Sequence, residues 1–130
     1  MTTTASPRSH RTARRLACAV LAPALLAIAI GAAVSHDTGL WPLFSFGLGP
    51  DIALFVGAGR GLARGRLHPR AVRFYNALHT IWLPLVLGAV ALLGIVPFGY
   101  LVGALAWAFH ITLDRAVGYG LRTRDGFQRS

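Results

Sequence analysis

The stretch LACAVLAPALLAIAIGAAV, residues 16–34, contains no charged side chain. At 1.5 Å per residue, a helix of this length crosses a hydrocarbon core of about 30 Å. Arg8, Arg11, Arg14 and Arg15 precede it. A cleaved signal peptide shares such a basic start, but its apolar part is usually shorter, about 7–15 residues. We therefore expect a retained transmembrane helix.

Three further apolar runs follow, and each is long enough for another membrane span. We predict an all-α fold, a four-helix transmembrane bundle packed closely through its many Gly and Ala residues. A disordered, basic segment at 1–15 and a basic tail at 122–130 flank a single domain, 16–121. The four spans are expected at about 16–34, 40–59, 74–93 and 98–113, with a Gly47-Leu48-Gly49-Pro50 break before Asp51 in the second.

The basic residues, all of them arginine, decide the orientation. They number thirteen and give the chain a formal charge of +9, although 55% of its residues are hydrophobic. Four arginines precede the first span, five lie between the second and third, and four follow the fourth. Positive charge collects on the cytoplasmic side of membrane proteins. We expect a multi-pass protein of the cell inner (plasma) membrane with both termini in the cytoplasm.

This placement of charge also predicts the partners. Arginines beside the inner leaflet contact anionic lipid headgroups, so the high charge does not require nucleic acid. Four short helices enclose little interior, which makes a homo-oligomer plausible.

Four histidine and aspartate side chains lie inside the expected spans or directly after them: Asp51, His79, His110 and Asp114. Counting residues from the span ends puts them in one layer near the cytoplasmic side. His110 and Asp114 are one helical turn apart, so they share a face. Ionisable groups are costly in hydrocarbon and are expected to face one another or a wet cavity.

Three interpretations of this layer remain open. The two histidines and two aspartates supply enough ligands for Zn, Mn or non-haem Fe, and such a metal could activate water against a lipid ester or phosphate. The same groups could instead relay protons in a small transporter. They could also be hydrogen-bonding contacts between helices in a structural or assembly protein.

The sequence Val117-Gly118-Tyr119-Gly120 matches the core of a potassium-channel filter. A filter needs a further span after it, and none follows here. We interpret Gly118 and Gly120 as a helix stop.

Several motifs resemble those of a family of small bacterial membrane proteins, the domain of unknown function family 4260. The motifs are Pro50-Asp51, Tyr75-Asn76-Ala77-Leu78-His79-Thr80 with Pro84, Trp107-Ala108-Phe109-His110-Ile111, Asp114-Arg115 and Gly118-Tyr119-Gly120-Leu121-Arg122. The resemblance covers roughly Leu16 to Phe127. The family usually continues through a Phe to a Thr-His-Leu stretch, whereas Gln128, Arg129 and Ser130 follow here. If that histidine contributes to a site, we expect this chain to lack it.

The family has no established activity, but its motifs mark the same residues as the layer of ionisable groups. We therefore take Asp51, His79, His110 and Asp114 as candidate catalytic and metal-binding residues. Tyr75, Asn76 and Arg115 are candidate substrate-binding residues. We expect Arg115 to bind a phosphate or lipid headgroup and Asn76 to orient His79.

Overall fold

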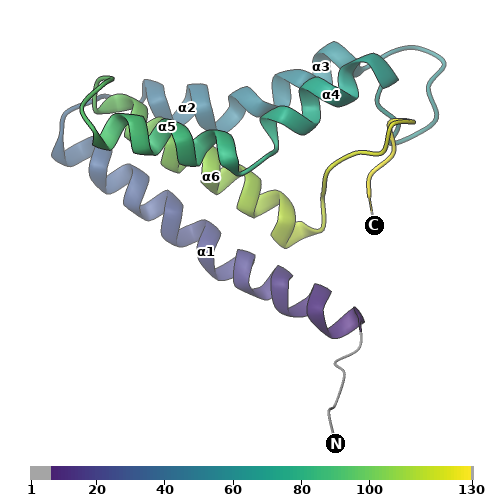
Figure 1. Cartoon of the computed structure of the whole chain (residues 1–130), viewed down its shortest axis with the longest axis horizontal. Helices are drawn as coiled ribbons and strands as arrows, with labels where there is room; N and C mark the ends of the chain where they lie inside the picture. The colour runs from purple at the N-terminus through teal and green to yellow at the C-terminus, as the bar shows by residue number, and fades with distance from the viewer. Residues whose placement is uncertain (1–6, 130) are drawn as a thin grey trace, which may run out of the picture.

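The computed structural model describes residues 7–129, and its regular elements are helices (Figure 1). Within that range the only β pairing is an isolated bridge between Arg122 and Gln128. The predicted all-α class is confirmed. The elements are α1 (Pro7–Ser35), α2 (Trp41–Leu48), the 3₁₀ turn η1 (Gly49–Asp51), α3 (Ile52–Gly57), α4 (Pro69–Leu78), α5 (Trp82–Leu92) and α6 (Gly99–Val117).

Helix α6 is the central element, because it packs against α1, α2 and α5 (Figure 1). Its buried side includes Gly103, Ala104 and Ala106. At Gly103 an added Cβ would lie 2.9 Å from ring atoms of Phe46 on α2. The small residues thus let neighbouring helices approach α6 closely, as expected for helices that pack in a membrane.

The expected second and third spans, 40–59 and 74–93, are each broken. The stretch Gly47-Leu48-Gly49-Pro50 predicted the break in the second span, whereas the third was expected to be continuous and is corrected. The first break is η1, where Gly49 precedes Pro50, and proline disfavours helical geometry in the residue before it. The second runs from 79 to 81, between α4 and α5. Pro84 then lies in the first turn of α5, where a missing N–H is tolerated. Asp51 and His79 lie at these two breaks.

The first and last helices are longer than the spans predicted for them. Helix α1 begins at Pro7, so residues 7–15, expected to be disordered, continue the helix. The rest of that segment, 1–6, lies outside the described residues. Helix α6 continues past residue 113 and ends at Gly118, whose φ of 99° is left-handed. The predicted glycine stop is confirmed there, since left-handed geometry favours glycine.

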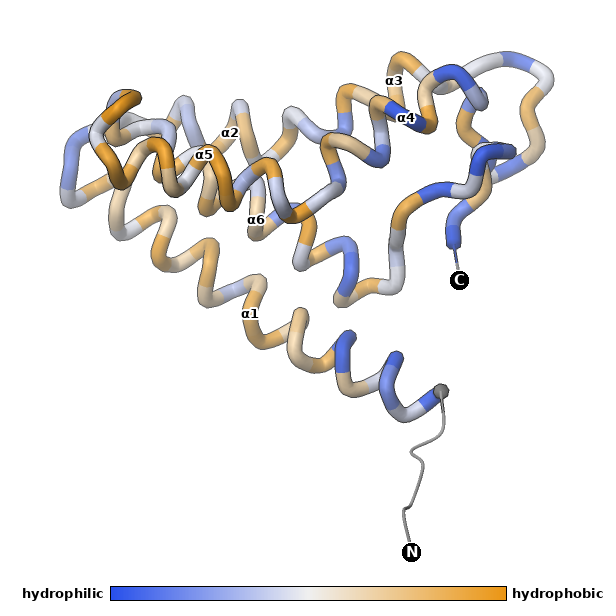
Figure 2. The backbone as a smooth tube through the Cα atoms, in the orientation of Figure 1, coloured by the Kyte–Doolittle hydropathy of each residue, from blue (hydrophilic) through white to orange (hydrophobic). Residues whose placement is uncertain are grey.

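The arginine-bearing segments meet at one end of the molecule. The start of α1, the loop 58–68 and the tail 118–129 all lie there (Figure 1), and Figure 2 shows hydrophilic residues gathered at this end. Leu67 N–H donates to the Gly126 carbonyl at 2.9 Å and joins the loop to the tail. At the other end His36 stacks on Phe98 with ring centroids 3.7 Å apart, joining the two turns there.

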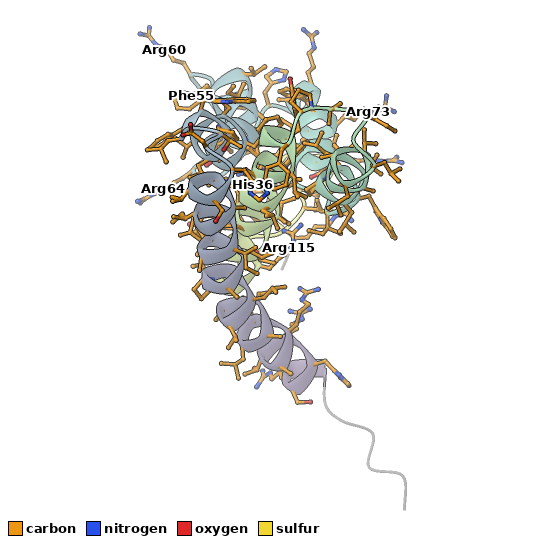
Figure 3. All side chains as sticks on the ribbon, turned by 90° about the vertical axis from the view of Figure 1, so that its left-hand side faces the viewer. His36, Phe55, Arg60, Arg64, Arg73 and Arg115 are labelled. Carbon is orange, nitrogen blue, oxygen red and sulfur yellow. The ribbon has the colours of Figure 1, made fainter. Side chains whose placement is uncertain are left out.

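Two helical segments are long and apolar enough to cross a membrane, Arg8–Ser35 and Pro69–Leu92; Trp41–Gly57 is apolar but shorter. Only 17% of the apolar window in the first is buried by the rest of the chain. Large apolar side chains stand exposed on several helices, among them Val20 and Phe55, the latter labelled in Figure 3. These surfaces are compatible with insertion into a bilayer.

Candidate functional site

The structure brings together the four ionisable side chains that the sequence placed in one layer. Asp51 comes from the end of η1 and His79 from the C-cap of α4. His110 and Asp114 lie one turn apart on α6. Three separate segments of the chain therefore contribute to one cluster, which we call the His/Asp cluster.

The distances within the His/Asp cluster are short. The two Nε2 atoms of His79 and His110 are 3.3 Å apart. Asp51 Oδ1 lies 3.7 Å from Nε2 of His79 and 3.5 Å from that of His110. Asp114 Oδ2 lies 3.5 Å and 3.8 Å from the same two atoms. Each carboxylate thus closes a triangle on the same pair of imidazole nitrogens.

The hydrogen bond of each Nδ1 atom, on the side of the ring away from the cluster, fixes the tautomer of that imidazole. Nδ1 of His79 lies 2.9 Å from the Tyr75 carbonyl oxygen, and Nδ1 of His110 lies 2.8 Å from the Gly47 carbonyl oxygen. A carbonyl oxygen only accepts, so each Nδ1 must carry the hydrogen and donate it. In the neutral imidazole each Nε2 then has a lone pair and no hydrogen. The inner atoms of the cluster are therefore all acceptors.

Four acceptors that face one another require a positive charge or shared protons between them. Metal-bound histidines almost always donate their other N–H to a carbonyl or carboxylate, as both do here. A tetrahedral zinc with ligands at 2.0–2.1 Å has ligand–ligand edges of about 3.3–3.4 Å. The triangle of His79, His110 and Asp51 has edges of 3.3, 3.5 and 3.7 Å, close to one face of such a tetrahedron.

Burial differs across the cluster. His79 is 1% exposed and His110 is 8% exposed, so the imidazoles are held inside the protein. The Asp51 side chain is 41% exposed and that of Asp114 is 19% exposed. The side of Asp51 is therefore the more open approach to the cluster.

An aromatic ring holds His79 in place from one face. The Tyr75 ring stacks on the imidazole with centroids 3.9 Å apart. The Arg122 guanidinium lies over the Tyr75 ring, 4.8 Å from its centroid. Tyr75 is itself buried. Its ring therefore contacts both the His79 imidazole and the tail. The expected contact of Tyr75 with substrate stays a prediction.

Asn76 binds the tail and not His79, which corrects the role we expected. Its Nδ2 donates to the Arg122 carbonyl at 3.0 Å, and its Oδ1 accepts from the Arg122 N–H at 2.7 Å. Both polar atoms of the amide are thus engaged by one peptide segment. This pair of bonds fixes the tail beside the cluster.

Arg115 lies next to the cluster. Its Nη2 donates to the His79 carbonyl at 3.1 Å, and its Nη1 donates to the Tyr119 carbonyl at 3.1 Å. The guanidinium therefore bridges the break after α4 and the turn after α6. It also borders a cavity that reaches His79.

Sequence reasoning did not find the backbone groups that complete the site. The carbonyls of Gly47 and Tyr75 orient the imidazoles. Trp107 donates its indole N–H to the Leu78 carbonyl at 2.7 Å and satisfies the end of α4. No sequence motif marks a carbonyl acceptor. In the sequence, Gly49-Pro50 indicated that the backbone before Asp51 is irregular.

Comparisons with known proteins agree with the motifs quoted above. Residues 17–130 match the family described as Domain of unknown function (DUF4260). No curated protein and no solved structure matches the chain. The family match covers most of the chain, and it includes all four residues of the His/Asp cluster. The chain belongs to the DUF4260 family.

Proposed function

We propose that this chain is an integral membrane protein whose His/Asp cluster binds a divalent metal, with zinc as the first candidate. The metal site acts as a hydrolase-like centre on a lipid-like substrate near the inner leaflet. The observation that carries the proposal is the pair of Nδ1–carbonyl bonds, because they turn two bare Nε2 atoms toward each other and toward two carboxylates.

In this proposal His79, His110 and Asp51 are the metal ligands, since atoms of these three residues all lie within 4.8 Å of one another. Two imidazoles and one carboxylate are a common set for a catalytic zinc that keeps a fourth position for water. Asp114 Oδ2 lies within 3.8 Å of both imidazole nitrogens, so it is placed to accept a proton from that water. A bound metal lowers the pKa of its water and polarises a substrate oxygen.

The proposed topology has four crossings, with both termini in the cytoplasm. The two turns without arginine meet at one end of the molecule, while the arginine-bearing segments meet at the other. Positive charge on one side favours that side as cytoplasmic. The breaks at η1 and after α4 are acceptable at membrane depth only when protein covers them. The contacts of Trp107 and Arg115 with the carbonyls of Leu78 and His79 support such cover at the break after α4.

The first experiment measures metal content by mass spectrometry on full-length protein purified in detergent without chelator. Wild type is compared with His79→Ala/His110→Ala, and His10→Ala/His36→Ala is the control with two exposed histidines changed. We expect about one zinc, manganese or iron per chain in wild type and control. The cluster variant should contain none.

Two other results would reject the metal proposal. Absence of metal from wild type, together with a less stable cluster variant, would mean that the polar residues serve as packing contacts. Absence of metal with unchanged stability would leave the proton relay, which predicts proton flux in proteoliposomes that is lost in Asp51→Asn.

The hydrolytic part needs a separate test. Asp114→Asn should keep the metal and lose turnover of a fluorescent lipid ester or lipid phosphate in mixed micelles, because it lacks only the proton acceptor. Asp51→Asn should lose both the bound metal and the turnover. Full turnover in metal-loaded Asp114→Asn would remove Asp114 from the mechanism.

A further inference from the structure

A second cavity, of about 370 Å³, lies at the arginine-rich end of the molecule. It is bordered by α1, by the end of α6 and by the tail. Five arginines line it: Arg11, Arg14, Arg15, Arg115 and Arg129. We call it the arginine cavity. None of the residues lining it is acidic.

Within residues 7–129, no ion pair offsets the positive charge of the arginine cavity. Across residues 7–129, the ion pairs within 4.0 Å join histidines to aspartates, and none includes an arginine. Like charges this close repel one another. An anion in the cavity would remove that repulsion. Guanidinium groups bind phosphate oxygens in a bidentate manner and remain charged at all physiological pH values.

The turn after α6 holds several of these arginines in position. The Arg15 guanidinium lies against Gly118, where an added Cβ would be 2.6 Å from Arg15 Nη2. Arg115 donates to the Tyr119 carbonyl in the same turn. The Gly120 N–H donates to Oε1 of Gln128 at 3.0 Å and ties the turn to the tail that carries Arg129. Guanidinium groups that are already positioned lose less entropy when they bind a ligand.

A neighbouring cavity of about 340 Å³ adjoins the arginine cavity and is lined by one residue of the His/Asp cluster, His79. It shares Arg14, Arg115 and Leu121 with the arginine cavity and includes His79. Its remaining walls are mainly apolar, from Ile81, Trp82, Ile111 and two threonines. A charged compartment beside an apolar one fits a molecule with a phosphate at one end and a hydrocarbon chain at the other.

We propose that the arginine cavity binds the phosphate group of an anionic phospholipid, with the lipid chain in the apolar cavity beside it. This assignment rests on the proposed function in one respect: it names the substrate class that would approach the metal. The phosphate binding itself needs no metal, because none of the five arginines belongs to the His/Asp cluster. A free phosphate offers the same chemistry without the chain.

The test uses full-length protein in a nonionic detergent, treated with chelator so that metal plays no part. Binding of short-chain phosphatidic acid, phosphatidylcholine and inorganic phosphate is measured by titration calorimetry. The variant is Arg14→Gln, since both cavities include Arg14. Arg8→Gln is the matched control, because Arg8 lies on the same helix and does not line either cavity.

We expect phosphatidic acid to bind wild type more tightly than phosphatidylcholine and inorganic phosphate. Arg14→Gln should weaken that binding roughly tenfold or more, as expected when a charge-assisted bond is lost. The control should change it less than twofold. Gly118→Ala, which displaces Arg15, should also weaken binding. Equal binding of inorganic phosphate would identify free phosphate as the ligand and reject the lipid.

Equal losses in Arg14→Gln and Arg8→Gln would overturn the proposal, because they would indicate a diffuse attraction of anions to this end of the molecule. Phosphatidic acid that binds no better than phosphatidylcholine would overturn it as well. If phosphate binds in chelated protein but no metal is found, the metal proposal fails and the arginine cavity stands. If metal is found but phosphate does not bind, the arginine cavity proposal fails and the metal proposal stands.

Discussion

Replacing Asp51 with asparagine should separate a metal site from an ion-pair contact by the sign of its effect on stability. Asp51 Oδ1 lies 3.5 Å from His110 Nε2 and 3.7 Å from His79 Nε2, and all three atoms lack hydrogen in the tautomer that the carbonyls impose. In metal-free protein, an asparagine would offer N–H donors to these acceptors. We therefore expect the melting temperature of metal-free Asp51→Asn to equal or exceed that of wild type.

With zinc bound, wild type should have a higher melting temperature than Asp51→Asn. At a zinc concentration 100 times the dissociation constant, binding stabilises the native state by about 2.7 kcal/mol. For a chain of this size that corresponds to a rise in melting temperature of roughly 10 °C. Loss of a direct ligand should weaken binding by about 100-fold or more, since even partners outside the ligand set contribute 10–100-fold. The variant should then gain less than about 0.4 kcal/mol, or roughly 2 °C.

The assay is a thermal melt in detergent, followed by intrinsic tryptophan fluorescence, with and without zinc. Asp37→Asn is the matched control, because Asp37 lies in a turn outside the cluster with a φ of 49° that asparagine tolerates. A metal-free Asp51→Asn protein that melts well below wild type would refute the reasoning. That result would show that Asp51 pairs with a protonated imidazole.

Three further outcomes follow from the packing and the proposed topology. Gly103→Ala should destabilise the protein by about 1–3 kcal/mol in a chemical-denaturation assay, because the methyl group meets Phe46, whereas Gly31→Ala has open space and should cause no loss. Asn76→Ala should release the tail from its two bonds to Arg122, seen as faster hydrogen exchange and proteolysis there with an unchanged helix content. A reporter fused to the C-terminus should be active only in the cytoplasm; activity on the outer side would contradict the proposed orientation.

Much of the His/Asp cluster was predictable because its members follow simple spacings. His110 and Asp114 share a helix face at i and i+4 in any α-helix. His79 and Asp51 were also expected near the cytoplasmic ends of their helices. In antiparallel helices of similar length, such residues lie at the same depth as His110 and Asp114. The predicted meeting of all four residues is borne out by contacts of 3.5–3.8 Å.

The partners of Asn76 and Tyr75 were not predictable in the same way. Spacing put Asn76 on the face of His79, but a side-chain amide takes whichever backbone comes within reach, and the tail supplies it. Tyr75 lies between His79 and Arg122, residues far apart in sequence. Such contacts depend on how a loop returns, and neither composition nor periodicity describes a loop path.

The sequence by itself determined the helical class, the glycine stop at residue 118 and the identity of the cluster residues, because apolar run length, glycine conformation and helical spacing act locally. Only the tertiary structure decided the rest. It broke the third predicted span at 79–81, set the tautomers through two backbone carbonyls, and gathered five arginines around one cavity. Each of these depends on groups that approach across the fold, and their positions are fixed only when the helices pack.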